Sequence, residues 1–159
     1  MATFVKKGKT IRFGDPIGVN FVQSDGNFSS DSDATVRHFI LRGVTTDATE
    51  TEIFVGNNTN SRMNLITDST WFFEVDIVAR RTDVDASACW RFTGAIDNNA
   101  VGGTAVAGSI QKEEFANDST YNTTVEADST NDALIVKVTG VGNDIIRWVG
   151  HCKTVQVIG

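Results

Sequence analysis

Paired carboxylates are the residues of this 159-residue sequence that come nearest to catalytic chemistry. Glu74 with Asp76, and Glu113 with Glu114, offer the two acids that glycoside hydrolysis requires. Acids that stand close together on one strand are more often a solvated surface than a catalytic pair. No G-x-S-x-G motif is present to supply a nucleophile with a positioned base. We therefore expect that the protein is not an enzyme, and we name no catalytic residue and no cofactor-binding residue.

Metal and thiol chemistry have equally weak candidates. The acidic loop Asp25–Asp33 invites calcium, but its glycine directly follows the first acid and does not fit the D-x-[DN]-x-[DN]-G pattern. A plain turn-rich loop is favoured, with calcium binding as an open alternative. Cys89 and Cys152 are too few for a zinc site or a disulfide framework, so buried free thiols are favoured over a bridge between them. His38 and His151 stand in strand-like segments without a motif and are expected in the core or at an interface.

The charge and the apolar runs of the chain argue against nucleic acid and membranes as partners. The formal net charge is −6, and the only local basic cluster comprises Lys6, Lys7, Lys9 and Arg12. Because a nucleic-acid site must neutralise phosphates with a basic patch, we expect no nucleic-acid partner. No apolar run approaches the roughly 20 residues of a membrane span, so we expect no membrane partner either. The N-terminus has no apolar core of a secretory signal peptide.

The element around which the sequence is organised is the segment Ser69–Thr82. Apolar residues alternate with polar ones along it, which predicts a strand with one buried face. The buried positions are Trp71, Phe73, Val75, Ile77 and Ala79. The even-numbered residues form the opposite face, where Phe72 and Val78 stand among charged residues. These two apolar residues make that face a candidate subunit contact.

A second alternating segment, Ala86–Ile96, follows after a short loop and predicts an antiparallel hairpin with the first. Matching the buried faces restricts the register, because an odd residue of the first strand must oppose an even one of the second. The tightest such register places Asp76 opposite Arg91 on the outside and Ile77 opposite Trp90 inside.

The C-terminal part predicts a further hairpin between Ala133–Val138 and Ile145–Ile158. In its second strand Val155 and Val157 lie on the opposite parity to Trp148. Either a bulge near Gly150 to Lys153 changes the face, or the strand is covered on both sides, as a subunit interface would do. The candidate interface residues are Phe72, Val78, His151, Val155 and Val157.

These segments predict an all-β fold, an antiparallel β-sandwich of jelly-roll type with about eight to ten strands. A chain of this length is expected to be one domain with a substantial core. We expect an N-terminal arm or edge segment over residues 1–34 and the sandwich core over residues 35–159.

Three motifs within Ser69–Val157, a little over half of the chain, are similar to a module of tailed-phage particles. They are a T-W-x-F strand ending in V-A-R-R-T-D (70–83), W-R-F-x-G-A-I (90–96) and I-R-W-V (146–149). The resemblance implies a non-catalytic virion component exposed on the particle surface. The first 66 or so residues carry no such motif.

The resemblance leaves the place on the particle open. It implies a homotrimer that contacts other virion proteins, either as a capsid cement or decoration protein or as a tail or fibre component. The alternative is a receptor- or carbohydrate-binding adhesin module at the tail, with a host-surface glycan as its partner. A free carbohydrate-binding module without a virion role is a third reading.

Overall fold

The computed structural model describes residues 21–22, 34–56, 58–117 and 120–159, and within these ranges the chain forms strands and no helix. The strands are β1 (Phe21–Val22), β2 (Ala34–Thr45), β3 (Thr51–Val55), β4 (Met63–Asn64), β5 (Ser69–Arg81), β6 (Ser87–Asn99), β7 (Gly103–Val106), β8 (Gln111–Asn117), β9 (Asn122–Asp128), β10 (Ala133–Thr139) and β11 (Ile146–Ile158). All their pairings are antiparallel, which confirms the all-β antiparallel part of the predicted fold class. None of the described residues forms a helix that could traverse a bilayer.

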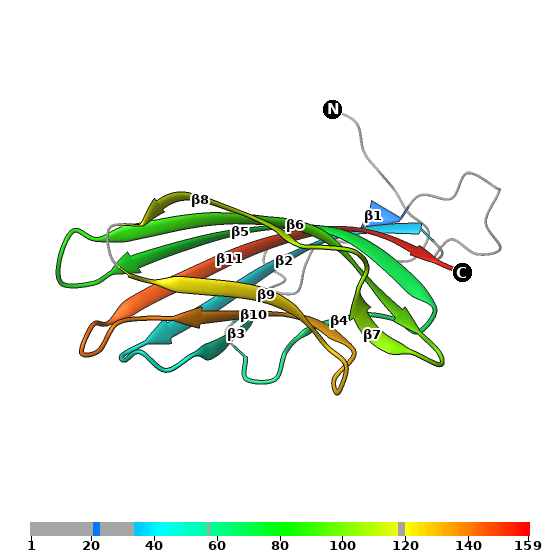
Figure 1. Cartoon of the computed structure of the whole chain (residues 1–159), viewed down its shortest axis with the longest axis horizontal. Coiled ribbons are helices and arrows are strands. Elements are labelled where there is room, and N and C mark those ends of the chain that lie inside the picture. The colour runs from blue at the N-terminus through cyan, green and yellow to red at the C-terminus, as the bar shows by residue number, and fades with distance from the viewer. Residues whose placement is uncertain (1–20, 23–33, 57, 118–119) are drawn as a thin grey trace, which may run out of the picture.

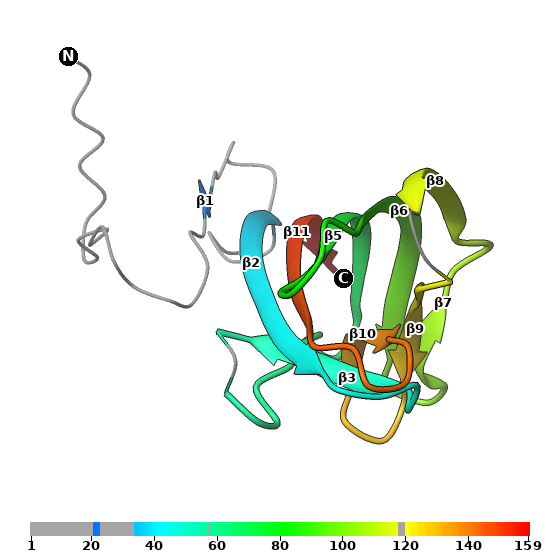
Figure 2. The ribbon, with the colours of Figure 1, turned by 90° about the vertical axis from the view of Figure 1, so that its left-hand side faces the viewer.

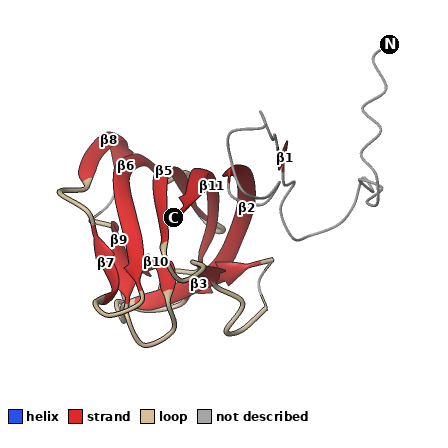
Figure 3. Ribbon diagram, turned by 90° about the vertical axis from the view of Figure 1, so that its right-hand side faces the viewer, coloured by secondary structure: helices blue, strands red, loops and turns tan. Residues whose placement is uncertain are grey.

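The strands join in one continuous sheet, whereas a jelly-roll sandwich has two separate sheets. Its order is β4-β10-β3-β2-β11-β5-β6-β7, with β9 beside β10, β8 beside β6, and β1 beside β2 (Figure 1). Figures 2 and 3 show how this sheet curls, so that β2, β11, β5 and β6 form one wall and β3, β10 and β9 lie across from it. Most of the expected N-terminal arm lies outside the described residues.

The curl depends on close approach at one glycine. Short β3 pairs with the end of β2 through Leu41 and Arg42 and with β10 on its other side. A side chain at Gly43 of β2 would collide with Ile53 of β3, so the absence of a Cβ lets β3 cross this close.

Side chains also connect the two ends of the curled sheet. Lys112 Nζ on β8 donates to the backbone oxygen of Thr123 on β9 at 2.9 Å, and Thr104 Oγ1 on β7 donates to Asp132 Oδ1 at 2.9 Å. Burial of Lys112 lowers the pKa of its amine. These hydrogen bonds join β7 and β8 at one end of the curled sheet to β9 and the β9–β10 turn at the other end.

The central hairpin has the register expected from its alternating pattern. Asp76 lies opposite Arg91, and Ile77 lies opposite Trp90. Arg91 Nε donates to Asp76 Oδ1 at 2.7 Å on the outside of the sheet. The prediction of the β5–β6 hairpin is thus confirmed.

Aromatic side chains of the long strands fill the core beneath this hairpin. The Trp90 and Trp148 rings stack with centroids 6.1 Å apart, and Tyr121 meets Trp148 edge-on. Both indole N–H groups are satisfied, because Trp90 Nε1 donates to Glu114 Oε2 and Trp148 Nε1 donates to Thr45 Oγ1. Large aromatic areas buried with their polar groups paired are a major source of stability.

The expected C-terminal hairpin is wrong. β10 pairs with β9 on one edge and with β3 and β4 on the other, while β11 lies between β2 and β5. The loop between β10 and β11 therefore crosses from one wall of the curled sheet to the other. Both strands were located correctly, but their partners are distant in sequence.

Candidate functional site

The four longest strands, β2, β11, β5 and β6, lie side by side and expose one wide face. Successive side chains of a strand alternate between the two sides of a sheet. One side of this wall packs on the core, and we call the other side the outward face. It carries the even-numbered residues of β2 and β5 and the odd-numbered residues of β6 and β11, as the burial patterns show.

The structure places all five predicted interface residues on this outward face. The exposed fractions are 56% for Phe72, 49% for Val78, 49% for Val155 and 46% for Val157, while His151 is partly buried. Phe72 lies directly opposite Val155 on the neighbouring strand. These residues, separated by up to 85 positions in sequence, therefore form one surface by strand register.

Many apolar residues of the outward face form two bands that cross the strands in register, while Ile40, Val44 and Val157 lie outside these bands. The first apolar band consists of Val36, Val155, Phe72 and Ala95. The second apolar band consists of Val149, Val78 and Cys89. Between them lies a polar belt made of His38, Lys153, Glu74, His151, Asp76 and Arg91.

Sequence reasoning missed the other members of these bands. Val149 has the same parity as Val155 and Val157, so its outward position followed from the same pattern. Ala95 follows from the predicted β5–β6 register, which places it opposite Phe72. Val36 could not be found in this way, because its proximity to Phe72 depends on the order of the strands.

β11 runs through the wall without a bulge, so that alternative is wrong. Its pairing with β2 and β5 is continuous, and its burial alternates strictly from Ile146 to Val157. The C-terminal half of β11 accordingly exposes Val155 and Val157 and buries Thr154 and Gln156. Apolar residues face outward and polar ones inward, which is the reverse of an ordinary solvated sheet.

The two histidines meet in the polar belt. The His38 and His151 rings stack with centroids 5.3 Å apart, and His38 Nδ1 lies 3.1 Å from His151 Nε2. Burial first, and then the proximity of His151 and Lys153, lowers the pKa of His38 below its ordinary value of 6.5. Asp76 and Glu74 face this pair from β5.

We expect His38 to make stability dependent on pH. With a lower pKa in the folded state, His38 binds fewer protons there than in the unfolded chain, so its contribution is present above about pH 6.5 and is lost as the pH falls through the folded pKa. Acidification from about pH 7.5 to about pH 5.5 should lower the melting temperature of the wild type more than that of His38→Gln. Equal decreases in the melting temperature, monitored by circular dichroism, would show that His38 is not the titrating group.

The carboxylates that resembled a catalytic pair have structural partners. Asp76 accepts a hydrogen bond from Arg91, which raises the pKa of that guanidinium, and Glu114 accepts one from the Trp90 indole. Glu74 lies opposite Lys153 on β11. Glu113 lies opposite Arg91 on β6.

The remaining candidates for chemistry are metal ligands and the two cysteines. Among the described residues no group of three or more His, Cys, Asp or Glu side chains could hold a metal ion. Cys89 lies on the outward face, and Cys152 points into the core, where burial raises its thiol pKa strongly. Both are free, so the bridge is excluded in this structure. The loop Asp25–Asp33 lies outside the described residues.

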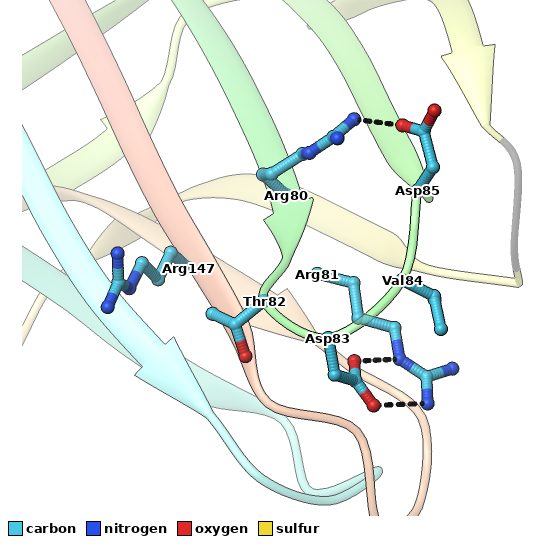
Figure 4. A pocket seen from close by; sticks show the side chains of 7 residues that line it. All are labelled: Arg80, Arg81, Thr82, Asp83, Val84, Asp85 and Arg147. Carbon is cyan, nitrogen blue, oxygen red and sulfur yellow. Dashed lines mark hydrogen bonds and ion pairs between the residues drawn. The ribbon is translucent and has the colours of Figure 1, made fainter.

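A hollow lies at the β5–β6 loop, near this face (Figure 4). It is lined by Arg80, Arg81, Thr82, Asp83, Val84, Asp85 and Arg147. Arg80 pairs with Asp85 at 2.6 Å, and Arg81 pairs with Asp83 at 2.6 Å. Four of its five charged residues therefore pair with one another, and Arg147 is the fifth.

Comparison with known proteins gives distant likenesses only. The sequence matches no family model and no curated protein. The tailspike protein of Acinetobacter baumannii phage AM24 is similar with 12% identity and a TM-score of 0.35, over 70% of this chain and 26% of that one. The tailspike protein of Acinetobacter phage vB_ApiP_P1 is similar with 10% identity and a TM-score of 0.28, over 92% of this chain and 24% of that one. This chain spans about a quarter of the length of either tailspike.

Proposed function

We propose that this chain is a non-catalytic structural subunit of a phage particle, exposed on the virion surface, which assembles with copies of itself through the outward face. The observation that carries the proposal is the first apolar band, where Phe72 and Val155 lie side by side and are each about half exposed. Monomeric proteins seldom leave contiguous apolar residues of this size uncovered.

The size of the outward face suits a subunit interface. Strands of 12 or 13 residues extend about 40 Å, and four strands spaced about 4.8 Å apart span roughly 14–19 Å. The resulting roughly 700 Å² is comparable to the about 800 Å² that each partner buries in a standard interface.

The composition of the face also suits contact with a second copy. Its apolar bands can pack against one another, while the polar belt carries both signs of charge, with Lys153 beside Glu74 and Asp76 beside Arg91. Mixed charges allow one part of the belt to pair with an oppositely charged part of the next copy around a threefold axis, and they disfavour wrong alignments. The stoichiometry that we propose is the trimer implied by the resemblance to the phage module.

The virion setting rests on that same resemblance and can be tested directly. In particles purified from the phage that carries the gene, an antibody against this chain should label the virion surface in electron microscopy. Labelling of the capsid would favour a cement or decoration protein, and labelling of the tail would favour a tail or fibre component. Absence of the chain from purified particles would overturn the proposed setting.

Deletion of the gene separates an assembly role from receptor recognition. Loss of a cement protein should lower the temperature at which capsids break and leave host adsorption unchanged. Loss of a tail adhesin should abolish adsorption, and the purified protein should then bind host cells or glycans. The exposed aromatic rings of Phe72 and Phe115 are the groups that a sugar-binding reading would use.

A further inference from the structure

Polar side chains gather on the inner side of the wall, at the end where β11 carries Thr154 and Gln156. We call this group, Thr35, Arg37, Trp71, Thr154 and Gln156, the polar corner. Strand register makes its members neighbours, since Arg37 lies opposite Thr154, and Gln156 lies between Thr35 and Trp71. Arg37 also places its guanidinium carbon 5.7 Å from the centre of the Trp71 ring.

Four polar atoms of the corner are buried and have no hydrogen-bond partner among residues 21–22, 34–56, 58–117 and 120–159. They are Arg37 Nε, Trp71 Nε1, Thr154 Oγ1 and Gln156 Nε2. Trp71 and Thr154 are 0% exposed and Gln156 is 2% exposed, so solvent does not satisfy these groups. Buried polar groups in native proteins are nearly always paired, and four exceptions at adjacent positions call for a missing partner.

The unpaired atoms share one chemical character. Arginine and tryptophan nitrogens can only donate hydrogen bonds, and a hydroxyl can also donate. The Thr35 hydroxyl donates to Gln156 Oε1 at 3.3 Å, which leaves the Gln156 amide nitrogen as the free donor. Three of the four unpaired atoms are therefore obligatory donors, the Thr154 hydroxyl can donate as well, and no acceptor among the described residues pairs with them.

Arg37 stands apart from the comparable arginines of the chain. Arg62, Arg81 and Arg91, which are likewise partly buried, each contact a carboxylate at 2.9 Å or less. The described residues provide no such carboxylate for Arg37, and burial lowers the pKa of its guanidinium. Arg37 as a whole is partly exposed, although its Nε atom is buried.

We propose that the polar corner binds the carboxylate group of a small organic acid, with Arg37, Trp71, Thr154 and Gln156 as its hydrogen-bond donors. A carboxylate only accepts, and it fits the fork of an arginine. Water fits less well, because each molecule would bring hydrogens of its own that need acceptors. The site goes beyond the assembly role, since it lies on the opposite side of the sheet from the outward face.

Acetate titration of the full-length protein tests this site. Trp71 belongs to the corner, so binding should produce a saturable change in tryptophan fluorescence, with one acetate per subunit by calorimetry. Sodium chloride at equal ionic strength should give no saturable change. A strictly linear response to acetate, or the same response to chloride, would overturn the proposal.

Two variants and a matched control assign the response to the corner. Arg37→Met should weaken acetate binding by about tenfold or more, because it removes charge-assisted hydrogen bonds. Gln156→Glu should abolish acetate binding by placing a competing negative charge in the corner. Arg42→Met, an arginine that is exposed on the same strand, should bind as the wild type does. Wild-type affinity in Arg37→Met, or a crystal structure from acetate with only water in the corner, would also overturn the site.

Discussion

Replacement of Trp90 by alanine is expected to lower the free energy of unfolding by about 3–5 kcal/mol. Trp90 is 2% exposed, stacks on Trp148 and donates its indole N–H to Glu114. The variant therefore loses buried area, leaves a cavity and removes a hydrogen bond at the centre of the β5–β6 hairpin. Urea unfolding at a fixed protein concentration measures the change, since self-association would add to apparent stability.

The control for this prediction is Phe115→Ala. Phe115 is 64% exposed, so the same kind of truncation should change stability by about 0.5 kcal/mol or less. If Trp90→Ala cost no more than this control, the aromatic stack would not be the main support of the core.

The second large effect is expected on assembly. Combining Phe72→Ser with Val155→Ser removes the centre of the first apolar band, and the two residues are outward and adjacent. Loss of central apolar contacts typically costs about 2 kcal/mol or more of association free energy, which is about a thirtyfold weaker complex. Sedimentation velocity should show subunits that dissociate at concentrations where the wild type stays assembled.

A neighbouring residue supplies the matched comparison. Phe73 is fully buried on the other side of β5, so Phe73→Ser should unfold the subunit, with loss of the strand signal in circular dichroism. The double variant on the outward face should keep that signal. If it unfolds as well, or keeps the wild-type sedimentation rate, the outward face is not the interface.

The sequence determines local features of this fold better than its long-range pairings. Strict alternation fixed the buried face of β5 and the register of the β5–β6 hairpin, including the Ile77–Trp90 pair. The partners of β10 and β11 could not be predicted, because alternation is the same for a strand beside its sequence neighbour and a strand beside a distant one. The single curled sheet depends on these distant pairings.

The outward face and the polar corner also differ in how far the sequence predicts them. Phe72 and Val78 stood out as apolar residues among charges on one strand, so their outward position was predictable. The polar corner was not, because Thr154 and Gln156 look like ordinary outward residues of a strand until β2 and β5 are placed beside them. The inward position of the polar residues at the end of β11 can therefore be recognised only when the register of β2, β11 and β5 is known.

The most direct test of self-assembly is the native mass of the full-length protein in solution. Light scattering coupled to size-exclusion chromatography should give a mass of three subunits of 17.2 kDa at micromolar concentration, maintained on moderate dilution. A mass of one subunit at every concentration tested would contradict assembly through the outward face.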